Sequence, residues 1–329
     1  MTEEKIKNLF KENIPGETVL SITPVTGGFM HRMYRVDTPD RSYAVKHLNP
    51  NVMKRPEAMA NYRKAEALES KLEKAGIAIV PALAFDSKKM QETEGDFFYI
   101  FDWVDGQITD WNNITTKQCK MAGEIQGRIH AIEHTENAEE KLEPCVINWS
   151  RYISAATAEK SETAHVLKDS EGLLDYALDE MNKAYQALPG ITTIIDEDMD
   201  PKNVMWNNGV PVVIDLECLD YGNPISSALQ LSLQWAGITT CDLDLQKVKA
   251  FFEGYLDAFD CGFRAYDKVF GLAYTWVEWL EYNVKRALGD CMDESERSMG
   301  VSEVINTINR IRYLYEHESQ IKEVLASVF

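Results

Sequence analysis

The first hundred positions contain several short segments whose apolar and polar residues are arranged as in β-strands. In residues 41–48 the larger side chains Tyr43, Val45 and His47 alternate with Ala44, Lys46 and Leu48, which predicts one strand. Two further runs, residues 21–25 and 33–37, flank a pair of glycines and therefore predict a β-hairpin. Residues 82–86 and 96–104 are the remaining strand candidates in this part of the chain.

Elsewhere the apolar residues recur with a helical period. Residues 57–75 form one such segment, and the glycine that follows them is a typical helix end. Beyond residue 106 the segments 117–132, 174–188 and 245–259 are also helical in pattern, and a strand–loop–strand section at residues 193–215 interrupts them. A small sheet with one helix, followed by a mostly helical remainder, predicts an α+β fold with a hinge near residue 103.

Composition and charge narrow the classes of function. Hydrophobic residues make up 45% of the 329 positions and charged residues 26%, as in a globular protein. The net charge of −19 argues against a nucleic-acid partner, because phosphates require a basic surface. The charge is compatible with a cationic substrate, although solubility alone also explains it.

Cysteine usage and hydropathy indicate the cellular compartment in which the protein functions. The six cysteines form no CxxC pair, which is typical of reduced thiols. The sequence contains neither a signal-peptide pattern nor an apolar run long enough to span a membrane. We therefore expect a cytoplasmic protein without a membrane partner, whose oligomeric state the sequence leaves open.

The most specific chemical signal is an acidic segment, residues 195–204, with the sequence IDEDMDPKNV. Asp198 and Asn203 have the Asp-x4-Asn spacing of a kinase catalytic loop, and the apolar residues 212–214 then lead to Asp215. In such a loop Asp198 would accept the proton of the attacking hydroxyl. Asn203 and Asp215 would hold Mg²⁺, which prefers hard oxygen ligands. The alternative is a solvated acidic turn, but the asparagine and the apolar strand before Asp215 favour the catalytic interpretation.

The N-terminal part carries residues suited to binding nucleotide phosphates. Gly27 and Gly28 allow backbone N–H groups to approach a phosphate closely, although a glycine pair in a hairpin is more often only a turn. Lys46 ends the stretch YAVK, which is close to the strand motif whose lysine contacts the α- and β-phosphates. A solvent-facing lysine is the alternative. The helix that follows offers Glu66 or Glu69 to fix Lys46, unless both glutamates are surface charges.

Taken in order, these motifs resemble the aminoglycoside phosphotransferase superfamily, which includes choline, homoserine and methylthioribose kinases. The resemblance rests on the segments Gly27-Gly28, Ala44-Val45-Lys46, Val80-Pro81, 98–106, Ile129-His130-Ala131, Asp198-x4-Asn203 and Ile214-Asp215-x-Glu217. It implies a two-lobed protein-kinase-like fold. Residues 1–103 would form a small nucleotide-binding N-lobe with an antiparallel sheet and one helix. Residues 104–329 would form a larger, mainly helical C-lobe for catalysis and substrate binding.

The resemblance also implies the cofactors ATP and Mg²⁺. ATP would bind between the lobes, with its adenine against backbone groups of the hinge around Asp102 and Val104. The family's distance between the glutamate and the glycine that ends its helix favours Glu66 over Glu69 as the partner of Lys46. The implied reaction is phosphorylation of a hydroxyl of a small molecule, such as an aminoglycoside, a choline-like amino alcohol, a sugar or a related metabolite.

One departure from the family bears on activity. The family usually has His-Gly before its catalytic aspartate, where this chain has Asp196-Glu197. The glycine lets the loop turn and the histidine helps to brace it. A catalytically impaired, nucleotide-binding regulatory protein of the same fold is therefore the second hypothesis. A protein acceptor is disfavoured, because no Ala-Pro-Glu-like segment follows Asp215.

Residues 274–283 are rich in aromatic and acidic side chains and form the candidate acceptor site. Trp276, Glu278, Trp279 and Tyr282 could surround an ammonium group through cation–π and ion-pair contacts. The alternative is that the tryptophans, which share a helical spacing with apolar neighbours, belong to the core. We expect a small-molecule acceptor that is compatible with a positive charge, and its identity stays open.

Overall fold

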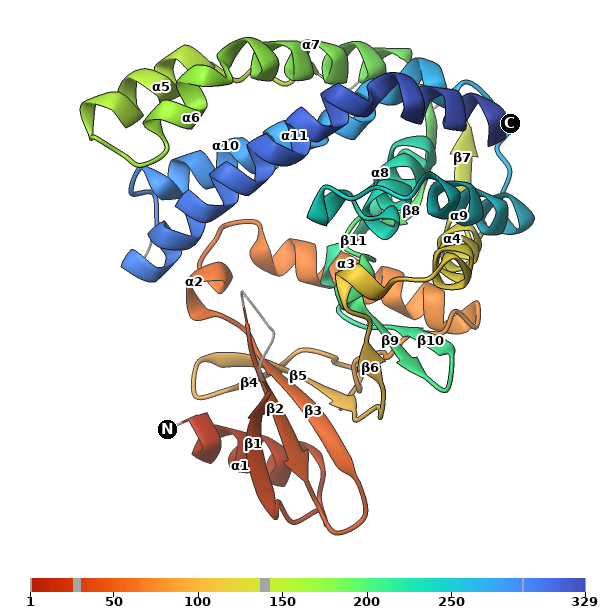
Figure 1. The fold of residues 1–329 in the computed structure, drawn as a ribbon. Helices are drawn as coiled ribbons and strands as arrows, with labels where there is room; N and C mark the ends of the chain where they lie inside the picture. Colours follow the sequence, from red (N-terminus) through yellow and green to blue (C-terminus); the bar gives the residue numbers. More distant parts are fainter. Residues whose placement is uncertain (1, 26–30, 137–142, 292, 329) are drawn as a thin grey trace. The chain divides into compact units, whose positions relative to one another are not determined.

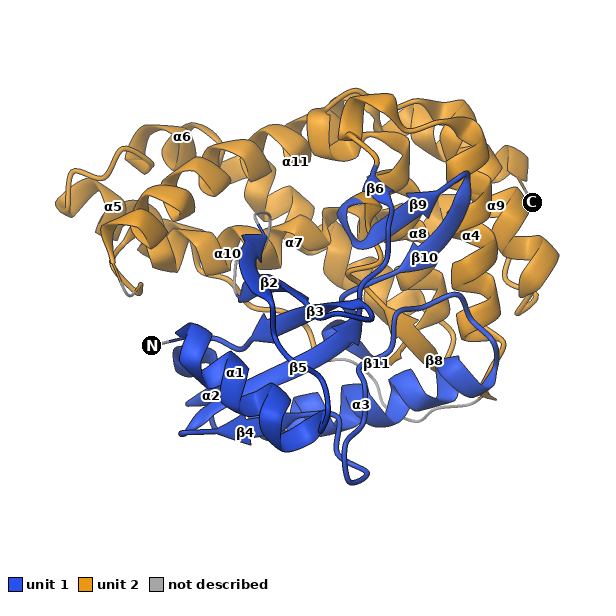
Figure 2. Cartoon of the chain, turned by 90° about the horizontal axis from the view of Figure 1, so that it is seen from below, with its two compact units in different colours: residues 1–108, 202–220 blue, residues 109–201, 221–329 orange. Residues whose placement is uncertain are grey.

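The computed structural model, drawn in Figure 1, describes residues 2–25, 31–136, 143–291 and 293–328. These residues form two compact units, which Figure 2 colours separately. Unit 1 contains residues 1–108 and 202–220, and unit 2 contains residues 109–201 and 221–329. The division at residue 103 into a nucleotide-binding lobe and a catalytic lobe stays a prediction.

A five-stranded antiparallel sheet with the strand order β1-β2-β3-β5-β4 is the centre of unit 1 (Figure 1). Its strands are β1 (Ser21–Val25), β2 (Arg32–Asp37), β3 (Ser42–His47), β4 (Gln91–Thr93) and β5 (Asp96–Asp102). β1 and β2 pair with Ser21 opposite Asp37 and Val25 opposite Met33, so the two strands of the predicted hairpin are confirmed.

Different helices cover the two faces of this sheet. α1 (Thr2–Asn13) packs three apolar side chains against one face, which contributes Tyr34, Val36, Tyr43, Val45, Phe98 and Ile100. α3 (Ala58–Lys74), which follows the short α2 (Pro50–Met53), packs Tyr62 together with Tyr99 of the other face. The apolar stripe of α3 is buried as its periodicity predicted, and Glu69 is buried beside it.

Residues 202–220 join unit 1 through a second, three-stranded sheet with the order β10-β9-β6. Its strands are β6 (Gln107–Ile108), β9 (Val204–Asn207) and β10 (Val210–Val213). At the end of β10, Val213 donates its N–H to the Ala78 carbonyl (2.8 Å) and accepts a hydrogen bond from the Val80 N–H (2.9 Å). These bonds hold the residues that follow β10 within unit 1.

The strand predicted at residues 82–86 is wrong. Ala82 and Phe85 make only isolated bridges, to Phe101 and Lys88. Asp86 and Ser87 adopt left-handed backbone conformations, with φ of 48° and 66°, and the extended chain therefore ends there.

Unit 2 is mainly helical. Its α-helices are α4 (Thr116–His130), α5 (Trp149–Ala158), α6 (Ala164–Asp169), α7 (Glu171–Ala187), α8 (Pro224–Ala236), α9 (Leu245–Ala258), α10 (Trp276–Ala287) and α11 (Glu294–Val328). α10 and α11 lie side by side (Figure 1). β7 (His134–Glu136) and β8 (Ile191–Asp196) pair antiparallel in a small sheet with the order β11-β8-β7, in which β11 spans Leu219–Gly222.

Short elements complete the chain. β11 (Leu219–Gly222) carries it from unit 1 into unit 2. The 3₁₀ helices are η1 (Trp111–Asn113), η2 (Pro201–Asn203), η3 (Leu216–Cys218), η4 (Ile238–Thr240) and η5 (Tyr266–Thr275). Strands precede a mainly helical remainder, which confirms the α+β prediction. Among the described residues, no helix has the length and apolar character that crossing a membrane requires.

Two helices of unit 2, α4 and α9, cross with their backbones in direct contact. A Cβ atom added at Gly123 of α4 would lie 1.9 Å from the Phe251 carbonyl oxygen of α9. A Cβ added at Gly254 of α9 would likewise lie 1.9 Å from the Lys120 carbonyl oxygen of α4. Real atoms cannot approach this closely, so glycine at both positions sets the distance between the helices.

We expect Gly123→Ala to lower the free energy of unfolding by roughly 1–3 kcal/mol or more, because the helices must separate to admit the methyl group. Gly172→Ala on α7 is the matched control, since a Cβ there meets nothing within 4 Å. It should leave stability unchanged or raise it by up to about 1 kcal/mol. Urea denaturation measures both, and equal effects of the two variants would contradict this packing.

Candidate functional site

Lys46, on β3, is a buried cation held by two carboxylates of the segment after β10. Its Nζ donates to Asp215 Oδ1 at 2.7 Å and lies 3.0 Å from Glu217 Oε1. Only 6% of the residue is exposed. Burial opposes its charge, but Glu217 and Asp215 raise the pKa of Lys46 above its usual value. Lys46 is therefore protonated, and a solvent-facing lysine is excluded.

The backbone around Asp215 brings Asn203 and both carboxylates into one region of unit 1. The Ile214 N–H donates to the Asn203 carbonyl at 2.9 Å. Because Ile214 directly precedes Asp215, this bond links the backbones at the two predicted metal-binding residues. Asp215 has φ 61° and ψ 65°, in the left-handed region that side chains other than glycine rarely adopt. Such strained residues often occur at functional sites. The η3 helix follows immediately, and Glu217 within it also reaches Lys46.

Glu217 is a further member of this cluster, which the sequence indicated only as part of a motif. Burial raises its pKa, but Lys46 and then His31 lower it more, so the pKa of Glu217 is about 2. Its spacing of two from Asp215 was the signal that could have identified it. Its second oxygen, Oε2, is buried and has no hydrogen-bond partner among the described residues.

His31, the residue before β2, supports Glu217. Its Nδ1 accepts a hydrogen bond from the Asn49 N–H (3.0 Å), so we place the ring proton on Nε2. Nε2 lies 3.1 Å from Glu217 Oε1 and 3.2 Å from the Tyr62 hydroxyl. No sequence signal pointed to His31, because its partners come from distant parts of the chain.

The ion pair expected between Lys46 and Glu66 does not form in this structure. Glu66 Oε1 instead accepts hydrogen bonds from the Tyr99 hydroxyl (2.9 Å) and the Met90 N–H (3.0 Å). These donors satisfy the Glu66 carboxylate, while Asp215 takes its place beside Lys46. Glu66 nevertheless lines the same pocket as Lys46, so its contribution to nucleotide binding stays a prediction.

Glu69, the other glutamate considered, is also occupied by its own neighbours. It forms an ion pair with Lys89 and accepts a hydrogen bond from the Ala82 N–H at 3.0 Å. Burial raises the pKa of Glu69 more than the ion pair with Lys89 and the hydrogen bond from Ala82 lower it. Its place beside the apolar stripe of α3 therefore reflects local packing.

The predicted adenine-binding residues lie at the end of β5. Asp102 is exposed and its carboxylate lies 3.5 Å from the Arg41 guanidinium. Val104 follows in irregular chain and is half-buried. Both belong to unit 1, as Lys46 does. Gly27 and Gly28 lie outside the described residues.

Asp198 belongs to unit 2, in the loop that follows β8. Asp196, which is 2% exposed, accepts a hydrogen bond from the Asp198 N–H through Oδ1 (3.2 Å). The Trp235 indole N–H donates to the Met199 carbonyl at 2.9 Å. The loop is thus braced where the family's histidine is missing, and a solvated acidic turn does not describe Asp196.

The four predicted acceptor-site residues lie on α10 in unit 2. Trp279 is 41% exposed, stacks on Tyr282 with ring centroids 5.5 Å apart, and donates its indole N–H to Glu303 (3.1 Å). Trp276 is half-buried under Arg310, whose guanidinium carbon lies 4.9 Å from the ring centroid. The tryptophans are therefore not part of the fully buried core.

Glu278 completes this group on α10. Desolvation of its carboxyl group, together with the nearby charge of Glu281, raises the pKa of Glu278.

Comparison with known proteins supports the motif-based resemblance. The model of the phosphotransferase enzyme family (APH) matches residues 21–269. No curated protein matches the chain by sequence.

Solved structures share the fold at low sequence identity. A spectinomycin phosphotransferase in complex with ADP and spectinomycin is 14% identical, with a TM-score of 0.69 and coverage of 94% of this chain and 97% of that one. A microcompartment-associated aminopropanol kinase is 11% identical (TM-score 0.63, coverage 96% and 98%). Choline kinase from Cryptosporidium parvum Iowa II is 12% identical (TM-score 0.60, coverage 99% and 99%). The predicted protein-kinase-like fold is thus confirmed.

We expect Glu217→Gln to lower the free energy of unfolding at pH 7 by on the order of 1–3 kcal/mol, because Lys46 loses a buried partner. The folded-state pKa of about 2 lies below the ordinary 4.5, so this stabilisation is present above pH 4.5 and is lost as the pH falls toward 2. Denaturation of parent and variant at pH 7, 4 and 3 tests this.

The difference between parent and Glu217→Gln should shrink at each step. Glu66→Gln is the control, because the amide oxygen can still accept from Tyr99 and Met90. A difference that is independent of pH would argue against a charged Glu217.

Proposed function

The chain belongs to the phosphotransferase enzyme family, and from this premise we propose that it uses ATP and Mg²⁺ to phosphorylate a hydroxyl group of a small molecule. The observation that carries the proposal is the contact between Lys46 and Asp215. These residues stand 169 positions apart in the chain, and yet Nζ and Oδ1 are 2.7 Å apart. A buried cation beside carboxylates is what binding a metal–triphosphate complex requires.

Lys46 would bind the nucleotide phosphates. Its ammonium group is a compact charge with three donors, which suits phosphate oxygens. Glu217 and Asp215 keep it charged and in place while no nucleotide is bound. We infer that the phosphates take over some of these donors, with Glu217 and His31 retaining the position of the lysine.

Asn203 and Asp215 would hold Mg²⁺, and their chemistry fits this ion. Mg²⁺ is usually bound by one or two carboxylates together with substrate phosphates and water, so a larger protein cage is not needed. Oε2 of Glu217, which has no hydrogen-bond partner in the described part of the chain, supplies a further buried oxygen in the same segment. When bound, the ion would offset the repulsion between these carboxylates and the phosphates.

Asp198 would accept the proton of the attacking hydroxyl. This role rests on its Asp-x4-Asn spacing to Asn203 and on the bracing of its loop by Asp196. Gly27 and Gly28 would cover the phosphates, and the backbones of Asp102 and Val104 would contact the nucleobase. The nucleotide would then bind to residues 1–103 and to the segment 202–220. The rest of residues 104–329 would bind the acceptor.

We infer an acceptor that carries a hydroxyl and a positive charge. Trp279, which is 41% exposed and stacks on Tyr282, can contact a cation through its outer π face, and Glu278 supplies a carboxylate. Tyr282 already has a cation beside it, because the Arg286 guanidinium carbon lies 5.5 Å from the centroid of its ring. The net charge of −19 also favours approach of a cation. The names of the aminopropanol and choline kinase structures support an amino alcohol acceptor.

Asp198→Asn should reduce turnover by roughly 10²- to 10⁴-fold, because the hydroxyl loses its proton acceptor, while Mg-ATP still binds. Acceptor-dependent ADP release across amino alcohols, sugars and aminoglycosides measures turnover, and calorimetry measures binding. Glu197→Gln, at the exposed neighbouring position, is the control and should stay within severalfold of the parent. Full activity of Asp198→Asn would refute the mechanism, whereas ATP binding without any acceptor would favour a regulatory protein.

Asp215→Asn should abolish the gain in ATP affinity that Mg²⁺ provides. Binding without the ion should persist or improve, because Lys46 is released from one of its carboxylates. Calorimetric titration of ATP with and without Mg²⁺ distinguishes these effects. An equal loss under both conditions would show that Asp215 does not act through the metal.

A further inference from the structure

The antiparallel register determines which side chains share the sheet face that carries Lys46. Successive residues of a strand point to opposite faces, and directly opposed residues of neighbouring strands share a face. Lys46 is opposite Met33 of β2, and Ala44 is opposite Arg35. Arg35 therefore lies on the same face as Lys46, away from the face that packs against α1.

Beside Lys46 on this face lies Ala44. Ala44 has a small side chain, is half-buried, and lies two residues from Lys46, or about 7 Å along the strand. Phe101 of β5 is opposite Ala44 on its other side. The Trp103 N–H donates to the Ser42 carbonyl at 3.2 Å, so Trp103 continues the same row. Larger side chains thus border Ala44.

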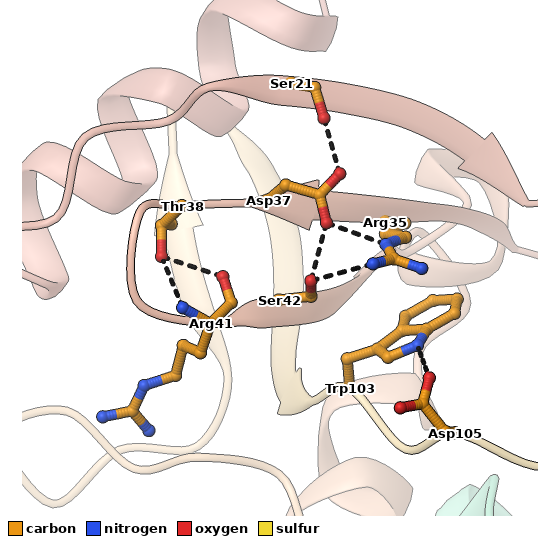
Figure 3. Close-up of polar contacts among 8 residues, drawn as sticks. All are labelled: Ser21, Arg35, Asp37, Thr38, Arg41, Ser42, Trp103 and Asp105. Atoms are coloured by element: carbon orange, nitrogen blue, oxygen red, sulfur yellow. Dashed lines mark hydrogen bonds and ion pairs between the residues drawn. The ribbon is translucent and has the colours of Figure 1, made fainter.

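Arg35 is held rigidly at this border (Figure 3). Its Nε donates to Asp37 Oδ1 at 2.8 Å and its Nη2 to the Ser42 hydroxyl at 3.1 Å. Its guanidinium carbon lies 4.7 Å from the centroid of the Trp103 ring. Hydrogen bonds from Ser21 and Ser42, and then from Arg35, hold the pKa of Asp37 well below its usual range. The Asp37 carboxylate, to which Arg35 is bound, is therefore always charged near neutral pH.

Two features suit Arg35 to binding a ligand. Its side chain is 41% exposed, and Nη1 has no hydrogen-bond partner among the described residues. The hairpin does not depend on the arginine, because Asp37 already accepts hydrogen bonds from Ser21 and Ser42, each at 2.6 Å. A planar, preorganised guanidinium with free donors binds flat, polar groups well.

We propose that Arg35 and Trp103 bind the nucleoside part of the nucleotide, with the base lying over Ala44 and Arg35 Nη1 donating to one of its acceptor atoms. This inference rests on the proposed use of a nucleoside triphosphate. It divides one sheet face into two subsites, since Lys46 binds the phosphates and Arg35 binds the nucleoside. A phosphate contact by Arg35 is disfavoured by its separation from Lys46 along the strands.

Titration with ATP and with inorganic triphosphate separates the two subsites. Arg35→Ala should weaken ATP binding by roughly three- to tenfold, as expected for loss of a partly exposed guanidinium contact, and should leave triphosphate binding unchanged. Lys46→Met should weaken both ligands. Arg32→Ala is the matched control, because Arg32 lies on the same strand and its register places it on the opposite face.

Arg35→Lys keeps the charge without the planar group and should bind triphosphate like the parent and ATP more weakly. It also tests the proposal if Arg35→Ala fails to fold. Unchanged ATP binding in Arg35→Ala, or equal weakening of ATP and triphosphate, would overturn the nucleoside subsite alone. A parent protein that binds no ATP would overturn the proposed function as well.

Discussion

The compensation of one buried charge, the Lys46 ammonium, constrains much of unit 1. An isolated ammonium in the interior is strongly unfavourable, so a buried lysine requires a carboxylate with good geometry. Asp215 and Glu217 supply two, and both come from a segment far along the chain. The second sheet, whose strand β10 bonds to residues 78 and 80, brings that segment back. The ion pairs of Lys46 therefore depend on the path by which the chain returns to unit 1.

The same constraint explains why the two glutamates of α3 have other partners. Once Asp215 and Glu217 surround Lys46, a third carboxylate would add repulsion without a further cation to balance it. Glu66 is instead satisfied by Tyr99 and a backbone N–H, and Glu69 by Lys89. His31 adds a hydrogen-bond donor to Glu217 from a third segment of the chain. The cluster thus combines few charges with many hydrogen bonds.

Local pattern predicted most of the elements correctly. Strand β2 and helix α3 follow from periods of 2 and 3.6 residues, because each buries one face. β1 is mostly exposed, and its place follows from its pairing with β2 across the predicted hairpin. The strand predicted at residues 82–86 failed, since the left-handed conformations of Asp86 and Ser87 are set by the local turn rather than by hydrophobicity. Local pattern also gave no sign of the role of the glycines in α4 and α9, because that role depends on contact with a neighbouring helix.

The sequence by itself determined the order of motifs, the α+β class and the family, because these depend on residue type and spacing along the chain. It identified Lys46, Asp198, Asn203 and Asp215 as candidates for the same reason. Only the tertiary structure decided which carboxylates contact Lys46 and that His31 joins them. Helical periodicity leaves Glu66 and Glu69 nearly equivalent, whereas an ion pair depends on distances of a few ångströms. Those distances result from packing between segments that are remote in the sequence.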